Sequence, residues 1–196
     1  MPWEKSFDVD EVLDKATEVF WSKGYEATSM SDLLAATGIN KGSLYNTYKN
    51  KKNLFVMGLL KYDRDHLRAE VTKLKAIPDP VAAIALMFDS MVDECAADKA
   101  HKGCLIVNTA LELPQHDSDV SDIVKAAMAD IERFFAEQII RGQQSGQLSS
   151  DIDPASAAQA LLSSVIAIRV MSRGVFDASG LSAIRTHALS VLSPPQ

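Results

Sequence analysis

Apolar residues recur three or four positions apart along most of the chain, which is the spacing of helices rather than of strands. The first such face begins after Asp8, which is placed to cap a helix with Glu11 three residues later. Gly24 marks a plausible end of this helix. Its apolar face is formed by Val9, Val12, Leu13, Ala16 and Phe20. The pattern predicts an all-α fold of about nine helices.

Three further capping residues divide the next part of the chain into two short helices and a long one. Ser29, Asn40 and Asn50 each precede a helical pattern, and Asp32 stands three residues after Ser29. The helices that they predict end near positions 37, 48 and 76. Two short helices joined by a glycine turn, here at Gly38, are typical of a helix-turn-helix, whose second helix enters the major groove of DNA.

Prolines and turn residues divide the rest of the chain. The stretch "AIPDPV", residues 76–81, ends the long helix and separates a small N-terminal domain from a larger C-terminal one. We assign residues 1–52 to the first domain and 53–196 to the second, and the helix from 51 to about 76 connects them. Pro114 is expected to end a short apolar segment. The remaining helical segments are predicted at about 80–97, 103–113, 120–145, 154–174 and 181–192.

Composition excludes several classes of protein. The chain has 196 residues, and its hydrophobic fraction of 47% is ordinary for a soluble globular protein. It has no run of roughly 18 to 20 apolar residues and no apolar signal core at its N-terminus, so we expect a cytoplasmic protein without a membrane partner. Two cysteines and four scattered histidines indicate no disulfide framework, metal site or cofactor. Without a nucleophile–base arrangement or a phosphate loop, we expect no enzyme.

The charge is unevenly distributed. The formal net charge is −6, yet Leu33–Tyr62 contains five lysines and no acidic residue. These lysines are Lys41, Lys49, Lys51, Lys52 and Lys61. A basic island on an acidic body suits a protein that touches a polyanion with one face. A solvated, lysine-rich helix end would give the same pattern.

The stretch "TSMSDLLAATGINKGSLYNTYKNKKNLF", residues 28–55, resembles the N-terminal motif of the TetR family, the tetracycline-repressor-like transcription regulators. The match covers about residues 8–56, and beyond Pro78 it rests on helix count and length. Asn46 departs from the family, where His is common, and Lys52 stands where an acidic residue is common. The motif residues are Thr28, Ser29, Ala35 or Ala36, Gly38, Ile39, Lys41 to Tyr45, Tyr48, Lys51, Leu54 and Phe55, with Ala16, Phe20, Gly24 and Tyr25 upstream.

The resemblance implies an all-α protein with an N-terminal three-helix helix-turn-helix domain and a C-terminal helical domain for ligand binding and dimerisation. It implies a homodimeric repressor that binds double-stranded DNA at a near-palindromic operator and is released by a small molecule or a reactive electrophile. A regulator without a small ligand, an activator, and a helical protein-interaction module that has lost DNA binding are the alternatives. An acidic residue in the stretch that would contact DNA would have favoured the interaction module, and there is none.

The resemblance also implies a set of DNA-binding residues. Asn46 could pair with adenine through its amide, and its change from the common His can alter the base that is read. Tyr45 and Tyr48 have packing as an alternative role, Ser29 caps a helix in either case, and Lys49 and Lys52 could be only solvated. The residues placed for the groove are Ser43, Tyr45 and Asn46. Those placed for phosphates are Thr28, Ser29, Lys41, Tyr48 and Lys51.

The C-terminal domain should hold a ligand pocket, although most of the candidate residues could equally be ordinary core. Asn108 and Glu112 are polar groups four positions apart in an apolar segment, and each could face a ligand or a neighbouring helix. The candidate wall residues are Met87, Phe88, Met91, Cys104, Leu105, Asn108, Leu111, Met128, Phe135 and Ile168.

Two further features of this domain bear on function. Residues of about 154–192 should pair with a second copy in a four-helix bundle, through a small-residue face around Ala160, Ser164 and Ala167. Close packing within one subunit is the alternative. Cys104 follows Lys102 at a helix start, where a cation and a helix N-terminus favour the thiolate form of a cysteine. It could sense electrophiles or oxidants, or be a small buried hydrophobic residue.

Overall fold

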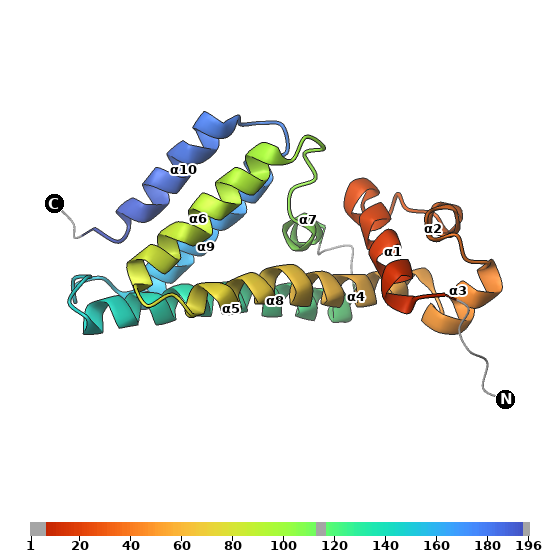
Figure 1. The fold of residues 1–196 in the computed structure, drawn as a ribbon, viewed down its shortest axis with the longest axis horizontal. Coiled ribbons are helices and arrows are strands. Elements are labelled where there is room, and N and C mark those ends of the chain that lie inside the picture. Colours follow the sequence, from red (N-terminus) through yellow and green to blue (C-terminus); the bar gives the residue numbers. More distant parts are fainter. Residues whose placement is uncertain (1–6, 113–116, 194–196) are drawn as a thin grey trace.

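The computed structural model describes residues 7–112 and 117–193, and within them all regular secondary structure is helical (Figure 1). The π-helix η1 (Asp63–Arg68) joins α4 to α5 in one continuous rod. When the rod is counted once, the described residues form nine helices, as predicted. The α-helices are α1 (Val9–Lys23), α2 (Met30–Thr37), α3 (Lys41–Tyr48), α4 (Lys51–Tyr62), α5 (Ala69–Lys75), α6 (Pro80–Ala97), α7 (Leu105–Leu111), α8 (Ser118–Gln144), α9 (Pro154–Met171) and α10 (Ala178–Ser190).

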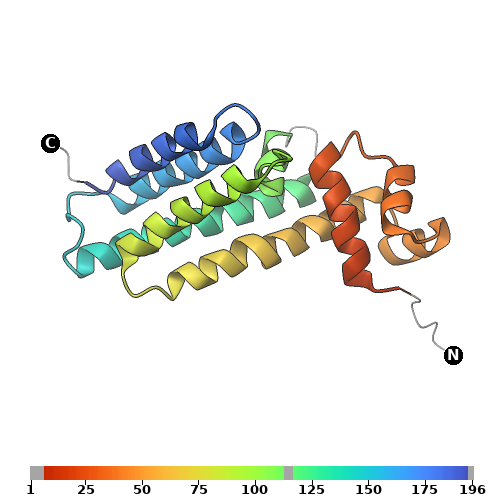
Figure 2. The same cartoon turned by 45° about the horizontal axis from the view of Figure 1, so that its top comes forward.

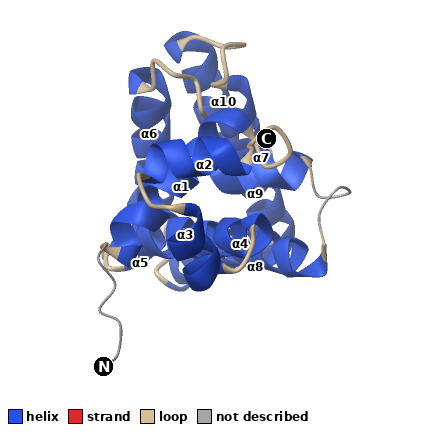
Figure 3. Ribbon diagram, turned by 90° about the vertical axis from the view of Figure 1, so that its right-hand side faces the viewer, coloured by secondary structure: helices blue, strands red, loops and turns tan. Residues whose placement is uncertain are grey.

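The molecule has a head and a body joined by the rod. The head, α1 to α3, lies at one end, and the body, α6 to α10, extends to the other (Figure 1). The rod and α8 run along the length of the molecule, α6 and α9 pack against α8, and α10 packs on α6 and α9 (Figure 2). Seen from the head end, α1, α2 and α3 stand in front of the body (Figure 3).

Local capping residues define the head helices. Asp32 completes a reciprocal capping box at α2 with Ser29. Gly38 ends α2 in the left-handed conformation, φ 72° and ψ 5°, which costs a residue with a Cβ more energy than glycine. The predicted helix-turn-helix is therefore confirmed in its boundaries and its turn. The four predicted N-caps all accept backbone hydrogen bonds through their side chains: Asp8, Ser29, Asn40 and Asn50.

The helices depart most clearly from the sequence prediction in three places, and the other bounds agree within about two residues. The helix predicted from 51 to 76 contains the π-helical segment, in which the winding is wider than in an α-helix. The α9 helix ends at Met171 rather than near 174, because the chain turns at Gly174 with a φ of 92°. The α10 helix begins at Ala178 rather than near 181, because the Asp177 side chain accepts the backbone N–H of Gly180 at 2.9 Å. The predicted stop at Pro114 lies outside the described residues.

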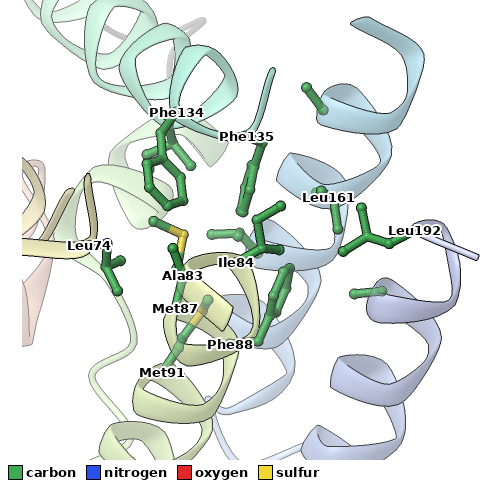
Figure 4. Packing of buried hydrophobic residues seen from close by; sticks show 14 of the residues in the cluster. Leu74, Ala83, Ile84, Met87, Phe88, Met91, Phe134, Phe135, Leu161 and Leu192 are labelled. Carbon is green, nitrogen blue, oxygen red and sulfur yellow. The ribbon is translucent and has the colours of Figure 1, made fainter. Parts of the chain in front are cut away.

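Two hydrophobic clusters hold the fold together. The body core consists of Leu74 and Leu192 with buried residues of α6, the second half of α8, α9, α10 and the turn between α8 and α9 (Figure 4). The head core extends beyond the head into α7 and the first half of α8, so it joins residues on both sides of the predicted 52/53 boundary. It consists of Val12, Leu13, Ala16, Phe20, Leu33, Leu44, Tyr48, Leu54, Phe55, Leu59, Tyr62, Cys104, Leu105, Ile106, Val107, Val120, Val124 and Ala127.

By length and composition alone, α9 qualifies as a candidate membrane span, which the sequence pattern did not indicate. Its 18 residues have a mean hydropathy of 1.3, and 28% of them are buried. The helix packs against α8, α10 and α6. A core helix of a soluble protein can have the same composition, so length and hydropathy do not by themselves indicate a membrane.

Candidate DNA-binding face and ligand cavity

The predicted groove-reading residues lie on α3, at the end of the molecule formed by the head (Figure 1). Tyr45 and Asn46 are exposed, and Tyr45 has 39% of its surface accessible. Ser43 is half-buried next to the cap, where its backbone N–H donates to Asn40 Oδ1 at 2.8 Å. The helix is held from behind by Leu44, which is fully buried in the head core. The outer face of α3 is thus polar and accessible.

Two of the residues predicted to contact phosphate have buried side chains. Thr28 is 1% exposed, and its hydroxyl donates to the carbonyl of Gly24 at 2.7 Å. Tyr48 is also 1% exposed, and its hydroxyl donates to the carbonyl of Val9 at 3.0 Å. Because both hydroxyls already have protein partners inside the head, these side chains hold the head together. For Tyr48 this fits the alternative role of packing, and phosphate contact through Thr28 and Tyr48 stays a prediction.

The lysines nearest to α3 keep their charge available. Lys41 and Lys49 are exposed at the two ends of the helix, and neither forms an ion pair with the described residues. The Nζ atom of Lys41 lies 5.8 Å from the ring centroid of Tyr45. Lys49 has a φ of 66°, a conformation that strains a residue with a Cβ. Lys51 is half-buried, with its Nζ 4.3 Å from the ring centroid of Tyr25.

Two other lysines of Leu33–Tyr62, here called the acid-free stretch, are paired with carboxylates that are distant in sequence. Lys52 binds Asp117 Oδ2 at 2.7 Å and Asp119 Oδ2 at 3.0 Å, both at the start of α8. These hydrogen bonds, first the one that Lys52 donates to Asp117, raise the pKa of Lys52. Lys61 pairs with Asp14 of α1. The net positive charge of the stretch is therefore concentrated around α3.

A cavity of about 300 Å³ lies between the rod and the body. Its wall is formed by apolar side chains, three of which are methionines, and by polar side chains such as Tyr62 and His66 of the rod and Arg169 of α9. Four of the predicted pocket residues line it: Met87, Met91, Cys104 and Met128. The sequence reasoning missed the other wall residues, which include Tyr62, His66, Leu67, Val71, Ser90, Val107, Ile131, Val165 and Arg169.

The remaining predicted pocket residues lie elsewhere. Phe88, Phe135 and Ile168 are fully buried in the body core and do not line this cavity. Figure 4 shows the rings of Phe88 and Phe135 among the other core side chains. Leu111 is 61% exposed at the end of α7. Leu105 and Asn108 line a smaller pocket of about 100 Å³ against α1, which Glu112 also lines. Asn108 donates through Nδ2 to the carbonyl of Lys102 at 2.8 Å.

The polar end of the cavity contains a thiol, a phenol and a guanidinium. The Tyr62 hydroxyl donates to Cys104 Sγ at 3.7 Å, and burial raises the pKa of Tyr62 well above its usual range. Arg169 donates to Glu94 Oε2 at 2.8 Å and to Cys95 Sγ at 3.6 Å. Burial lowers the pKa of Arg169, but the hydrogen bond with Glu94 and the charge interactions with Glu94, Cys104 and Cys95 together outweigh burial, so the net pKa is raised. Tyr62 and Arg169 therefore stay protonated, as hydrogen-bond donors.

The two cysteines are free and buried. Within the described residues, no group of three or more His, Cys, Asp and Glu side chains could hold a metal ion. Arg169 could have been noticed in the sequence, because it is the one charged residue in an otherwise uncharged helical segment, 154–171. No local pattern distinguishes Tyr62, which lines the cavity only because the rod lies against the body.

Two family models match the chain. The model of bacterial regulatory proteins of the tetR family matches residues 12–56, and that of the tetracyclin repressor-like C-terminal domain matches residues 80–188. The first contains α2 and α3 and the second contains most of the cavity wall. The two matches therefore cover the candidate DNA-binding face and most of the cavity wall, but not the part of the wall that the rod contributes.

Individual proteins match over most of their length. The HTH-type transcriptional regulator YezE of Bacillus subtilis is 31% identical over 189 residues, which cover 96% of this chain and 97% of YezE. The HTH-type transcriptional repressor ComR of Escherichia coli is 31% identical over 158 residues, 80% of this chain and 75% of ComR. A solved structure of a cysteine mutant of the regulator CifR, complexed with 26-bp double-strand operator DNA, superimposes with a TM-score of 0.84 at 28% identity and covers 98% of this chain and 100% of CifR.

Proposed function

The chain belongs to the TetR family of DNA-binding transcriptional regulators, and we propose that it is a homodimeric repressor which leaves a near-palindromic operator when a small molecule or a reactive electrophile enters the cavity. It is a regulator rather than an enzyme. The observation that supports operator binding best is the exposed polar face of α3. Lys41 and Lys49 at its two ends form no ion pair within residues 7–112 and 117–193, and Leu33–Tyr62 contains no carboxylate. The proposal places the protein in the cytoplasm with its DNA.

In this proposal α3 enters the major groove. The amide of Asn46 can donate to and accept from the edge of adenine, and Ser43 and Tyr45 flank it on the same helix. Lys41 and Lys49 would meet phosphates, as would the exposed N-terminus of α2 at Ser29 and the half-buried Lys51. Because these lysines would displace counterions from the phosphates, binding should strengthen as salt is lowered.

One head would bury little surface on DNA, so the proposal includes a dimer. Two heads spaced by about one helical turn would read the two halves of a near-palindrome. The surface that we assign to the dimer is formed by α9 and α10, residues of about 154–192. Ala160, Ser164 and Ala167 keep part of their surface accessible in one chain, which supports the approach of a second copy. The low buried fraction of the apolar helix α9 supports the same surface.

Release from the operator would begin in the cavity. Its methionines can adapt to different apolar ligands, and Tyr62 and Arg169 provide donors. A reactive electrophile would instead modify Cys104, whose sulfur would add to an activated C=C bond. In that step an S–C bond forms, the π bond breaks and the thiol proton moves to the neighbouring carbon. Either occupant would shift the protein between two positions of the heads.

Selection from a random duplex library at two salt concentrations tests the proposal. We expect enrichment of a near-palindrome of roughly 10 to 20 base pairs, with an affinity that falls steeply as salt rises. Sedimentation of the protein alone should give the mass of two chains. If no sequence is enriched even at low salt, the head does not read DNA by itself, and the interaction-module alternative takes its place.

A further inference from the structure

The segment between α6 and α7, residues 98–104, is a folded loop that lies between the head and the body. Its backbone is held by Asp98, whose Oδ2 accepts the backbone N–H of Lys102 at 2.7 Å. His101 and Gly103 both have left-handed backbone angles, with φ of 51° and 67°. The non-glycine residue in this conformation carries backbone strain, so the surrounding contacts must fix the loop.

One side of the loop rests on the C-terminal end of α9. His101 Nδ1 lies 3.1 Å from the carbonyl oxygen of Ser172. A Cβ atom added to Gly103 would lie 3.0 Å from the carbonyl oxygen of Arg169, so only glycine fits this approach without displacement. The loop is therefore in close contact with the helix that we assign to the dimer surface.

The other side of the loop binds α1 of the head. The Nζ atom of Lys102 donates to both carboxylate oxygens of Glu18, at 3.0 Å and 3.1 Å. It also lies 4.3 Å from the ring centroid of Trp21, which is the geometry of a cation–π contact. The Lys102 side chain is only 24% exposed, so water weakens these contacts less than those of a surface lysine.

The same residues are linked to the cavity. The ring of Trp21 packs edge-on against Tyr62, with the centroids 5.1 Å apart. Tyr62 lines the cavity and donates to Cys104, which also lines it and stands two residues after Lys102. Cys104, Tyr62, Trp21 and Lys102 therefore form a closed ring of contacts, here called the circuit. Each contacts the next, and the backbone of residues 102–104 links Lys102 back to Cys104. An occupant that displaced Tyr62 or Cys104 would also displace the contacts with α1.

We infer that Lys102, together with Glu18 and Trp21, is the joint through which occupancy of the cavity changes the position of the DNA-binding head. This inference rests on the proposed function, because it requires that the cavity control operator binding. The circuit has the short contacts that energetic coupling between two sites requires. If these contacts only stabilised the position of the head, their loss would lower the stability of the fold. It would not change how much an occupied cavity weakens operator binding.

The test uses a methylthio group on Cys104 as the occupant. In a Cys95→Ser parent, methyl methanethiosulfonate reacts with the remaining thiol. The S–S bond of the adduct forms, methanesulfinate leaves, and the thiol proton goes to solvent. Complete modification is verified by mass spectrometry. Equilibrium affinity for the selected operator is then measured with and without the adduct, in the parent, in Lys102→Met and in Glu18→Gln.

We expect the adduct to weaken operator binding of the parent by about fivefold or more, within the usual range of allosteric coupling. In Lys102→Met and in Glu18→Gln the two affinities should agree within about twofold. Lys102→Met keeps an apolar stem over Trp21, and Glu18 is 56% exposed, so both variants should fold. Lys99→Met is the matched control, since Lys99 is an exposed lysine of the same loop and has no ion pair in the described parts of the chain. It should behave like the parent.

Each result is decisive. If the adduct weakens binding equally in the parent and in Lys102→Met, or if unmodified Lys102→Met no longer binds the operator, the joint is not the transmitting element. If the adduct leaves the parent unaffected, the cavity does not control operator binding, and the release step of the proposed function fails instead. Val165→Met, which adds volume inside the cavity without a chemical reaction, provides a second occupant for the same comparison.

Discussion

The outer face of α3 and the cavity differ in the distance over which their residues are brought together. On α3, the cap at Asn40 and the exposed Asn46 belong to one run of neighbouring residues. The cavity is lined by residues from three separate elements: Tyr62 of the rod, Cys104 at the start of α7 and Arg169 of α9. A surface made by one helix follows from local sequence signals, whereas a cavity depends on how distant helices pack. The predictions below test this difference, from the largest expected effect to the smallest.

The largest effect should separate two residues that the sequence placed together in the pocket. Phe88→Ala should lower the free energy of unfolding by about 3–5 kcal/mol, because it removes a fully buried ring that stacks on Phe135. Leu111→Ala should change it by less than about 0.5 kcal/mol, because that side chain is mostly exposed. Urea unfolding of both variants measures the difference. Similar losses would mean that α7 is more tightly packed than the structure shows.

Asn46→Ala should weaken specific operator binding by about 10- to 100-fold, or about 1–3 kcal/mol, if the amide pairs with a base. Its thermal unfolding should not change, since the side chain is exposed and lies outside the head core. Fluorescence anisotropy with the selected operator measures the affinity. Gln144→Ala, an exposed amide at the end of α8, is the control and should have no effect. An equal loss on operator and on unrelated DNA would assign Asn46 to the phosphates instead.

Two lysines of the acid-free stretch should differ in their effect on salt dependence. Lys41→Gln should reduce the slope of log affinity against log salt by about 0.9, the value for one phosphate contact. Lys52→Gln should reduce it less, because Asp117 and Asp119 already hold this side chain. Operator titrations at four salt concentrations give both slopes. The comparison fails if Lys52 has the larger effect, which would require Lys52 to leave its carboxylate partners when DNA binds.

The smallest effect concerns the cap of α2. Hydrogen bonds from Lys23 and then from Ser29 hold the pKa of Asp32 well below its usual range. A lowered folded-state pKa stabilises the fold above the ordinary aspartate pKa of about 3.9, and this contribution is lost as pH falls below it. The melting temperature of Asp32→Asn should therefore be lower than that of the unaltered protein at pH 7, and the gap should narrow at pH 3. Asp151→Asn, in an exposed turn, is the control.

The sequence predicted most of the head and less of the body, for physical reasons. N-caps and the Gly38 turn are local signals, so the bounds of α2 and α3 could be placed closely. The π-helix could not, because its Asp63 is buried and bound by Arg68, which also binds Asp130 of α8. Such a contact between distant elements has no periodic signature.

Local signals likewise located the residues on the surface of α3 but not those that are buried by distant helices. The α3 face was correctly located as exposed because the apolar residues of the helix are few and mark its inner side. The burial of Thr28 and Tyr48 depends on the packing of α1 and the following turn against them, as the bond from Tyr48 to Val9 shows. In the pocket, helical periodicity shows that Phe88 and Met91 are internal, but it cannot distinguish close-packed core from cavity wall.

The head core has a practical consequence for protein engineering. Because it includes Leu105 and Ile106 of α7 and Val120 of α8, the DNA-binding end cannot be exchanged as a self-contained cassette. A chimera that joined another regulator's first 52 residues to this body would place unmatched side chains against α7 and α8, and its stability would suffer. Retargeting this regulator to a new operator would therefore start with substitutions on the solvent side of α3, which leave that shared packing intact.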